Sequence, residues 1–463
     1  MARTFHIRTF GCQMNDHDSE RLAGLLMADG LVPAPDAEHA DVVVLNTCCI
    51  RENADNKLYG HLGHLKSLRD RRPGMQIAVG GCLAQKEGEA LRRRAAYVDV
   101  VFGTHNLARA PALLRQAALD GPVVEVPEAA APDGDGQLAQ ALGAARELSY
   151  AAWVTIQTGC DNSCAFCIVP QVRGPEVSRP IDDVVTEVSA LAARGVSEVT
   201  LLGQNVNSYG RDLTRRRPLF AALLQAVGAV DGVRRVRYTS PHPKDLRPET
   251  MVAMAETPAV CEHLHLPLQS GSDRILRAMR RGYSAERYLA RLAAARAAVD
   301  DLAVTTDIIV GFPGETDDDF ERTLEVAAEA AYDSAYTFIF SPRPGTRAAA
   351  MADRFVPDDV VAERFERLRV VVERSALARH RARVGRVEEV LVEGPSKRDP
   401  GVVTGRTRQN KLVHFPPPAG GAPVEGSYAQ VHVTEAAPHH LRGDLVGVDA
   451  PARRRIRIPV SAG

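Results

Sequence analysis

Short apolar runs alternate with segments of helical periodicity along the first part of the chain. Four of these runs are rich in β-forming residues and read "FHIRTF", "DVVVLN", "QIAVGG" and "YVDVVFG". The segments between them place apolar residues at helical spacing. Strands that alternate with helices are typical of a parallel, doubly wound sheet, so we predict an α/β domain over residues 1–120.

The same alternation resumes after a segment of different composition. Residues 121–148 are rich in Ala, Pro, Gly and acidic residues, which is typical of a linker. Six further strand candidates follow: "WVTIQT", "SEVTLL", "VRRVRYT", "EHLHLP", "VTTDIIV" and "AYTFIF". Helical patterns follow the strands, and a long one runs from Pro357 to about Arg383. We therefore predict a partial (βα)6 barrel of the TIM type over residues 149–383.

The C-terminal part has a pattern of short strands without helices. Five strand candidates, from "VEEVLVEG" to "LRGDLVGV", lie within residues 384–450 with turn residues between them. Such a pattern predicts a small, OB-like β-barrel of the kind that often binds oligonucleotides. Arg406, Arg408 and Lys411 lie in or beside its loops and are the predicted RNA contacts. A solvated charged face is the alternative interpretation.

Composition limits the classes of protein that fit. The 463 residues are 45% hydrophobic and 25% charged, which is typical of globular proteins. The formal net charge of -1 gives no overall attraction to nucleic acid, so an RNA partner needs a local basic patch. The N-terminus has no apolar signal core, and no apolar run approaches the ~20 residues of a membrane span, so we expect a cytoplasmic protein.

Eight cysteines are too few for a disulfide scaffold in a chain of this length, and three of them lie within "GCDNSCAFCIVP". Cys160, Cys164 and Cys167 have the spacing C-x3-C-x2-C. A structural zinc site usually takes four protein ligands, whereas a 4Fe-4S cluster with three thiolates keeps one iron open. The spacing therefore favours a cluster with a free iron for a small molecule.

The members of a second set of cysteines occupy the same position relative to successive strands. Cys12, Cys48 and Cys82 each follow one of the first three strand candidates by one or two residues. The carboxyl ends of parallel strands share one edge of a sheet, so the three thiols should meet in space. Three separate buried thiols are the alternative, because cysteine is a frequent core residue.

The C-x3-C-x2-C loop after the first barrel strand resembles the cluster loop of the radical S-adenosylmethionine enzymes. The resemblance implies that Cys160, Cys164 and Cys167 bind a 4Fe-4S cluster whose open iron takes S-adenosylmethionine. It also implies that glycine-rich and polar loops at the barrel strand ends cradle this cofactor. These residues are Gly203, Gln204, Asn205, Gln269, Ser270, Gly271, Gly311, Pro313 and Gly314. No catalytic residue is expected beyond the cluster ligands.

Nearly the whole chain resembles the methylthiotransferase family within that superfamily. "FGCQMN", "NTCCIRENA" and "GGCLAQ" are similar to its N-terminal domain, which implies a second 4Fe-4S cluster on Cys12, Cys48 and Cys82. Cys49 stands where the family more often has a small residue, so either neighbour could be the ligand, and we favour Cys48. The strand-rich tail is similar to the TRAM RNA-binding domain of the family.

Within the family, "LLGQNVNSYG" and "RENA" are similar to members that methylthiolate carbon 2 of N6-dimethylallyladenosine in tRNA, next to the anticodon. Members that act on ribosomal protein usually have aspartate and threonine where Asn205 and Val206 stand. The resemblance implies a monomeric, membrane-free enzyme with a tRNA substrate, an electron donor such as a flavodoxin or ferredoxin, and a cluster or sulfur donor protein. Two alternatives remain within the family: threonylcarbamoyladenosine in tRNA, or a ribosomal protein aspartate. A non-catalytic RNA-binding metalloprotein is the alternative from another class.

Overall fold

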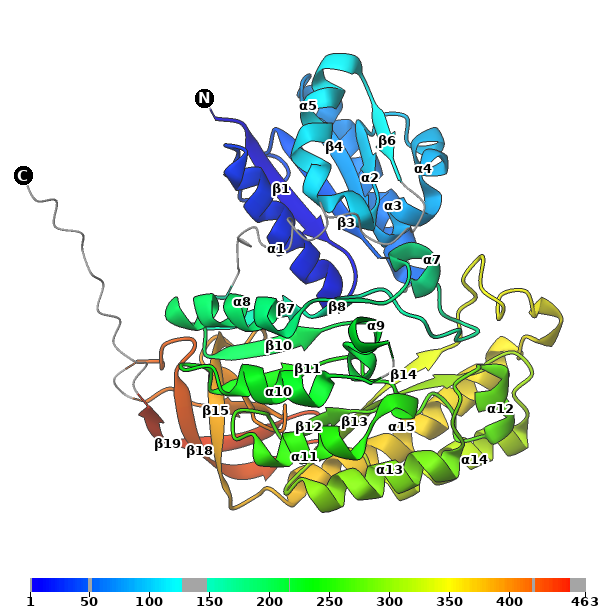
Figure 1. Ribbon diagram of the computed structural model, residues 1–463, viewed down its shortest axis with the longest axis vertical. Coiled ribbons are helices and arrows are strands. Elements are labelled where there is room, and N and C mark those ends of the chain that lie inside the picture. The colour runs from blue at the N-terminus through cyan, green and yellow to red at the C-terminus, as the bar shows by residue number, and fades with distance from the viewer. Residues whose placement is uncertain (1, 49–51, 127–147, 216, 419–420, 450–463) are drawn as a thin grey trace, which may run out of the picture.

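The first part of the chain folds into a parallel sheet covered on both faces by helices, coloured blue to cyan in Figure 1. The computed structural model describes residues 2–48, 52–126, 148–215, 217–418 and 421–449. The six strands have the order β2-β1-β3-β4-β5-β6. They are β1 (Thr4–Thr9), β2 (Val32–Pro33), β3 (Val42–Thr47), β4 (Gln76–Gly81), β5 (Val100–Phe102) and β6 (Val123–Glu125). The helices are α1 (Gln13–Ala28), α2 (Glu52–Arg71), α3 (Cys82–Glu87), α4 (Glu89–Arg94) and α5 (Ala110–Asp120), with a 3-10 helix at Thr104–Arg109.

Alternation of side chains along β3 explains why both faces of this sheet are covered. Val43 and Leu45 pack into one hydrophobic cluster, and Val42 and Val44 pack into another on the opposite face. A strand that is buried on both faces needs apolar residues at every position, as "DVVVLN" provides. The sheet also extends beyond residue 120, because β6 pairs with β5 inside the segment that composition assigns to the linker.

Six parallel strands then form an open barrel, as the pattern of βα units predicts. One sheet contains β7 (Ala151–Thr155), β10 (Glu198–Leu202) and β11 (Arg235–Tyr238), and the other contains β12 (His263–His265), β13 (Ala303–Val310) and β14 (Ser334–Ile339). A parallel bridge between Val236 and Val260 connects the two sheets. The order β7-β10-β11-β12-β13-β14 leaves β7 and β14 as the edges of an incomplete barrel.

Helices cover the outer side of this barrel because alternate strand residues are apolar and point outward. Val199 and Leu201 of β10, for example, are fully buried in the cluster formed with the helices. The helices of this part of the chain are α7 (Val169–Arg173), α8 (Ile181–Ala193), α9 (Arg211–Thr214), α10 (Phe220–Gly228), α11 (Pro248–Glu256), α12 (Asp273–Ala278), α13 (Ala285–Ala298), α14 (Asp317–Ala330) and α15 (Asp358–Arg381), with 3-10 turns at Val206–Ser208, Pro243–Asp245 and Ala352–Arg354. Of these, α7 lies against the first domain instead of the barrel. A short antiparallel pair, β8 (Gln157–Thr158) and β9 (Val177–Ser178), frames the loop of the three clustered cysteines.

The C-terminal strands close into a small barrel with the order β15-β16-β17-β19-β18. They are β15 (Val387–Pro395), β16 (Val403–Thr407), β17 (Leu412–Phe415), β18 (Tyr428–Ala436) and β19 (Leu441–Asp449). Alternate residues such as Val390, Val392, Val431 and Val433 fill its interior. All five predicted strands are therefore present. None of the helices in the described part of the chain is both long and apolar enough to cross a lipid bilayer.

The small barrel packs against the amino-terminal ends of the open barrel strands. Its partners there lie at or just before the first residue of a strand: Ser197 for β10, Arg235 for β11, Glu262 for β12, Asp301 for β13 and Asp333 for β14. The cysteine loop lies at the opposite, carboxyl-terminal end. Strand carboxyl ends are where such barrels build their active sites.

Candidate functional site

The first set of cysteines lies at the carboxyl ends of three neighbouring strands. Cys12 follows β1 and precedes α1, Cys48 directly follows β3, and Cys82 directly follows β4. Cys48 and Cys82 are buried, and a hydrogen bond with the Cys48 thiol lowers the pKa of Cys12 to about 6. Topology therefore brings the thiols of Cys12 and Cys48 together. That Cys82 joins them as a third cluster ligand stays a prediction. Cys49 lies outside the described residues.

Polar side chains hold these strand ends in place. The Asn15 amide donates to the Thr47 carbonyl at 3.1 Å, and the Asn46 amide donates to the Asn15 carbonyl at 2.8 Å. Gly81 has φ of 94°, and a Cβ there would lie 2.5 Å from the Thr47 carbonyl oxygen. Only glycine allows β3 and β4 to end this close together.

The second set of cysteines lies in the loop between β8 and α7. Burial raises the pKa of Cys160 to about 11 and that of Cys167 to about 12. Together with Cys164, these thiols line a cavity of about 510 Å³. A buried thiol with a raised pKa is a protonated group in the protein alone, and a bound cation reverses this preference. The observation that favours a metal cluster is the geometry, three thiols around one cavity.

Two cationic side chains that sequence reasoning missed surround this loop. The guanidinium of Arg281 donates to Cys164 Sγ at 3.3 Å and is buried. Lys244 Nζ donates to Asn162 Oδ1 at 2.7 Å. Lys244 belongs to the loop after β11. Arg281 is in a turn between α12 and α13, where its sequence context gives no signal.

A smaller cavity of about 180 Å³ connects the two sets of cysteines. Cys12 and Cys82 line it from the first domain, and Cys160, Cys164 and Cys167 line it from the open barrel. It is therefore an interdomain cavity with five thiols around it. Predicted cofactor residues Gly203 and Gln204 also line it, together with Ser240, His242, Arg173 and Arg281.

The donor set fits iron–sulfur clusters better than single ions. Among the described residues, no three His, Cys, Asp or Glu side chains converge closely enough to bind one metal ion. A 4Fe-4S cluster instead takes one thiolate at each iron corner, so its ligands are spread around a volume. Thiols arranged around cavities, as here, meet that requirement.

Buried polar atoms without protein partners lie in the loop after β10, whose Gln204 lines the smaller cavity. Both polar atoms of the Gln204 side chain are buried without a hydrogen bond, and so are Asn205 Oδ1 and Asn207 Oδ1. Unsatisfied buried polar groups are rare in proteins and usually mark a bound molecule or water. The loop after β10 is thus prepared for a polar ligand next to the cysteine loop, which fits S-adenosylmethionine.

The other predicted cofactor residues are held by protein contacts. The Gly271 amide donates to Thr323 Oγ1 at 3.0 Å, and the Gly311 amide donates to Glu315 Oε2 at 2.9 Å. Of the described residues that line the two cavities, none belongs to 269–271 or 311–314. Gln269, Ser270, Gly271, Gly311, Pro313 and Gly314 shape the strand ends, and their contact with a cofactor stays a prediction.

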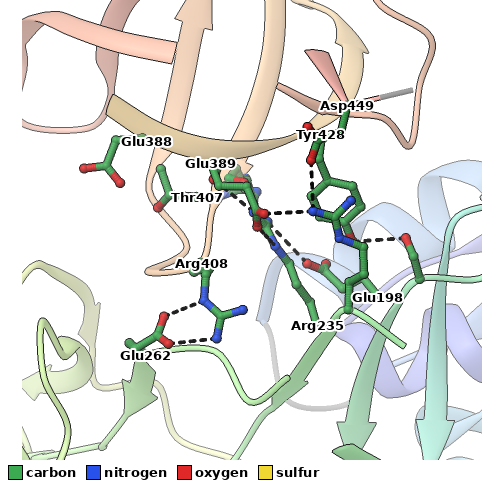
Figure 2. A network of polar contacts seen from close by, with 12 residues as sticks. Glu198, Arg235, Glu262, Glu388, Glu389, Thr407, Arg408, Tyr428 and Asp449 are labelled. Carbon is green, nitrogen blue, oxygen red and sulfur yellow. Dashed lines mark hydrogen bonds and ion pairs between the residues drawn. The ribbon is translucent and has the colours of Figure 1, made fainter. Parts of the chain in front are cut away.

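The structure corrects the assignment of two predicted RNA-binding residues. Arg408 forms a bidentate ion pair with Glu262, at 2.7 and 2.8 Å, and Lys411 Nζ lies 2.6 Å from Asp333 Oδ1 (Figure 2 shows the Arg408 pair). Lys411 is only 5% exposed. Both charges are used between the small barrel and the open barrel, so neither is available for a phosphate. Arg406 is 40% exposed at its side chain, pairs with Glu393 and stays a predicted RNA contact.

The same interface contains a fully buried arginine. Arg235 donates to the Glu389 carboxylate and carbonyl, both at 2.9 Å, and to the Arg406 carbonyl at 2.8 Å (Figure 2). Arg234 stacks on the Tyr428 ring at 3.7 Å. Backbone carbonyls and a carboxylate thus accept hydrogen bonds from most of the donors of the Arg235 guanidinium. These contacts join the two barrels.

Three known families match successive parts of the chain. Residues 4–103 match the uncharacterized protein family UPF0004, residues 154–327 match the radical SAM superfamily, and residues 381–446 match the TRAM domain. Each match lies mainly in one structural unit: the parallel sheet, the open barrel and the small closed barrel.

Similar proteins extend over nearly the full chain. A tRNA-2-methylthio-N(6)-dimethylallyladenosine synthase from Mycolicibacterium vanbaalenii is 54% identical over 453 residues, which cover 96% of this chain and 88% of that protein. Synthase 1 of the same description from Mycobacterium marinum is 52% identical over 460 residues, with 96% and 86% coverage.

Solved structures show the same fold at much lower identity. The radical S-adenosylmethionine methyltransferase TsrM from Kitasatospora setae, with tryptophan substrate and a SAM analog bound, has a TM-score of 0.55 at 14% identity and covers 75% of each chain. The same enzyme with cobalamin and a [4Fe-4S] cluster bound has a TM-score of 0.52 at 13% identity, covering 75% of this chain and 77% of that one.

Proposed function

The chain belongs to the family of the tRNA-2-methylthio-N(6)-dimethylallyladenosine synthases, and we propose that it transfers a methylthio group to carbon 2 of N6-dimethylallyladenosine in tRNA, next to the anticodon. The single observation that carries this proposal is the cavity between the domains, around which five cysteines of two separate sets are gathered. A methylthiotransferase needs a sulfur-carrying site and a radical-generating site at one place. A protein with two independent structural metal sites has no such need.

We assign Cys160, Cys164 and Cys167 to one 4Fe-4S cluster and Cys12, Cys48 and Cys82 to the other. When bound there, three-thiolate clusters leave one iron open and supply reductive cleavage of S-adenosylmethionine on one side and a place for sulfur on the other. The role of the chain is to orient the cofactor and the cluster ligands and to enclose them. Gln204 and Asn205 offer unpaired polar atoms to the polar part of the cofactor, and Arg281 fixes Cys164 through its hydrogen bond.

Further partners follow from this reaction. Reductive cleavage needs an external electron donor, such as a flavodoxin or ferredoxin, and turnover needs a donor of sulfur or of a new cluster. We propose that tRNA reaches the exposed basic residues of the small barrel, including Arg406, and that the enzyme acts as a monomer in the cytoplasm, where tRNA is modified.

Analysis of tRNA nucleosides tests the substrate assignment directly. Deletion of the gene should remove 2-methylthio-N6-dimethylallyladenosine from the tRNA pool, as measured by mass spectrometry, and leave N6-dimethylallyladenosine in its place. Loss of a methylthio group from threonylcarbamoyladenosine, or from a ribosomal protein aspartate, would assign the chain to another branch of the family instead.

Two alanine variants separate the roles of the cysteine sets. Cys167→Ala removes a ligand of the site next to the cofactor cavity, so release of 5′-deoxyadenosine should fall to background together with methylthiolation. Cys48→Ala leaves that site intact, so 5′-deoxyadenosine should still form under reduction, without methylthio product. Circular dichroism of both apoproteins controls for folding. Full methylthiolation by Cys48→Ala would contradict the assignment, and Cys49→Ala would then be the next variant.

A further inference from the structure

A short helix of the open barrel is packed into the hydrophobic core of the first domain. This helix, α7, directly follows the cysteine loop and lies beside the first domain, next to α3 (Figure 1). Ile168 and Val172 are each 2% exposed, within the cluster that contains Val43 and Leu83. The Thr104 hydroxyl also donates to the Val172 carbonyl at 2.6 Å. The cysteine loop is thus anchored in the other domain.

An ion pair across the two domains lies at the end of this helix. Arg173, the last residue of α7, donates through its guanidinium to Asp18 Oδ2 at 2.8 Å. The two side chains are 8% and 11% exposed. Asp18 belongs to α1, the helix that begins directly after Cys12. The pair therefore connects the helix that follows one set of cysteines with the helix that follows the other.

The position of Arg173 gives its charge a second role. The side chain lines the cavity between the two sets, and its charge interacts with the thiols of both Cys12 and Cys82. Among the contacts of the described residues, the Arg173 guanidinium donates a hydrogen bond to one carboxylate, that of Asp18. Charges interact strongly in such a buried environment, because water does not screen them there.

We propose that Arg173 is a positioning residue for both sites: it locks the first domain onto the cysteine loop and places a fixed positive charge beside the cluster of Cys12, Cys48 and Cys82. This inference rests on the proposed function, because it takes that set as a cluster site. Net charge around an iron–sulfur cluster sets its reduction potential, and a nearby cation favours the reduced, more negative state. The effect of Arg173 on that potential then has a definite sign.

The potential of the N-terminal cluster tests the electrostatic part. The full chain with Cys160, Cys164 and Cys167 replaced by alanine and reconstituted anaerobically carries that cluster alone, so a redox titration followed by EPR reports on it. Arg173→Gln should shift the midpoint to more negative values. Arg173→Lys keeps the charge and should stay near the parent value. Asp18→Asn removes the neighbouring negative charge and should shift the midpoint in the positive direction.

A charge exchange tests the docking part without any cluster. In the apoprotein, Arg173→Asp should place two carboxylates opposite each other and make the helices that carry them, α1 and α7, more sensitive to limited proteolysis by at least severalfold. The double variant Asp18→Arg with Arg173→Asp should recover most of the resistance. A residue that only fills space would not be rescued by the exchange.

The redox titration decides the electrostatic role of Arg173, and the proteolysis decides its docking role. Equal midpoints for the Gln, Lys and Asn variants, or a proteolysis pattern that the exchange does not rescue, would overturn the corresponding role of Arg173 even if the tRNA product forms. An N-terminal set that takes up no iron overturns the premise. If the triple-alanine chain shows the expected shifts while the chain with all its cysteines yields no methylthio product, the result supports Arg173 and counts against the proposed function alone.

Discussion

Gly159 shapes the cysteine loop through its backbone alone. It has φ of 77°, and a Cβ there would lie 1.8 Å from the Pro175 carbonyl oxygen. The first cysteine of the loop then donates its backbone amide to the Gly174 carbonyl at 3.1 Å. Gly159→Ala should therefore displace the β8–β9 frame, and we expect iron uptake by the Cys160 set to fall to a small fraction of the parent value. Iron and sulfide analysis after anaerobic reconstitution measures this.

Gly63→Ala is the matched control for that variant. Gly63 lies in α2, and a Cβ there meets nothing within 4 Å. Replacement by alanine in an exposed helix should leave iron content unchanged and stabilise the protein by roughly 0.5–1 kcal/mol. Normal iron content in Gly159→Ala would show that the loop tolerates a different path.

Single residues also show which parts of the site could be read from the sequence. The positions of the six cysteines could be read from it, because their spacing and their places after strands are local features; their role as cluster ligands stays a prediction. Arg173, Arg281 and Lys411 could not, because each is defined by a partner far away in the chain: Asp18, Cys164 and Asp333. A long cationic side chain has the same local pattern whether it contacts a phosphate or a buried carboxylate.

The N-terminus of α14 depends on one carboxylate. Burial alone would raise the pKa of Asp319, but hydrogen bonds from Arg274, Ser272 and Thr316 outweigh it and hold that pKa below its ordinary value. Ser272 Oγ donates at 2.5 Å, and the Thr316 amide donates at 2.9 Å in a capping box. A lowered carboxyl pKa stabilises the fold above the unfolded value of about 4 and loses this contribution below it.

Asp319→Asn should therefore destabilise the apoprotein by roughly 2–4 kcal/mol at pH 7, and the difference from the parent should shrink as the pH falls to 3. Urea unfolding at the two pH values measures it. Asp318→Asn is the control, since Asp318 is exposed in the same helical turn and should change stability by less than about 0.5 kcal/mol. A pH-independent deficit would mean that Asp319 acts by packing.

Elements differ in how well the sequence predicts them. The strands from "DVVVLN" and "VTTDIIV" and the long helix α15 are present because long, periodic segments determine their own type. The missed strands β2 and β9 have two residues each and β6 has three. So short a segment has no periodicity, and only pairing with a neighbour makes it a strand.

The molecule as a whole is held together by charges that look available for RNA in the sequence. Lys411→Met should leave the salt dependence of tRNA binding unchanged, because a lost phosphate contact would reduce the log-log slope by roughly 0.7–0.9. It should instead leave Asp333 as a buried carboxylate without its ion-pair partner and destabilise the interface by roughly 3–5 kcal/mol. Filter binding across salt concentrations and calorimetry measure the two effects.

Lys397→Met is the control at this scale, because Lys397 is an exposed lysine of the same small barrel. It should change thermal stability by less than about 0.5 kcal/mol. If Lys411→Met reduced the slope of tRNA affinity against salt concentration and left the melting temperature unchanged, Lys411 would be an RNA contact. That result would contradict the buried ion pair.

The burial of α7 in the first domain also affects the order of events during synthesis. The chain leaves the ribosome from its N-terminus at about 5–20 residues per second, and domains usually fold as they emerge. Here the strands and helices up to β6 are complete before Ile168 and Val172 have been made, although these two side chains belong to the same hydrophobic cluster. For some seconds the nascent first domain exposes the apolar surface that Ile168 and Val172 later bury. A chaperone or the newly made helix must cover this surface.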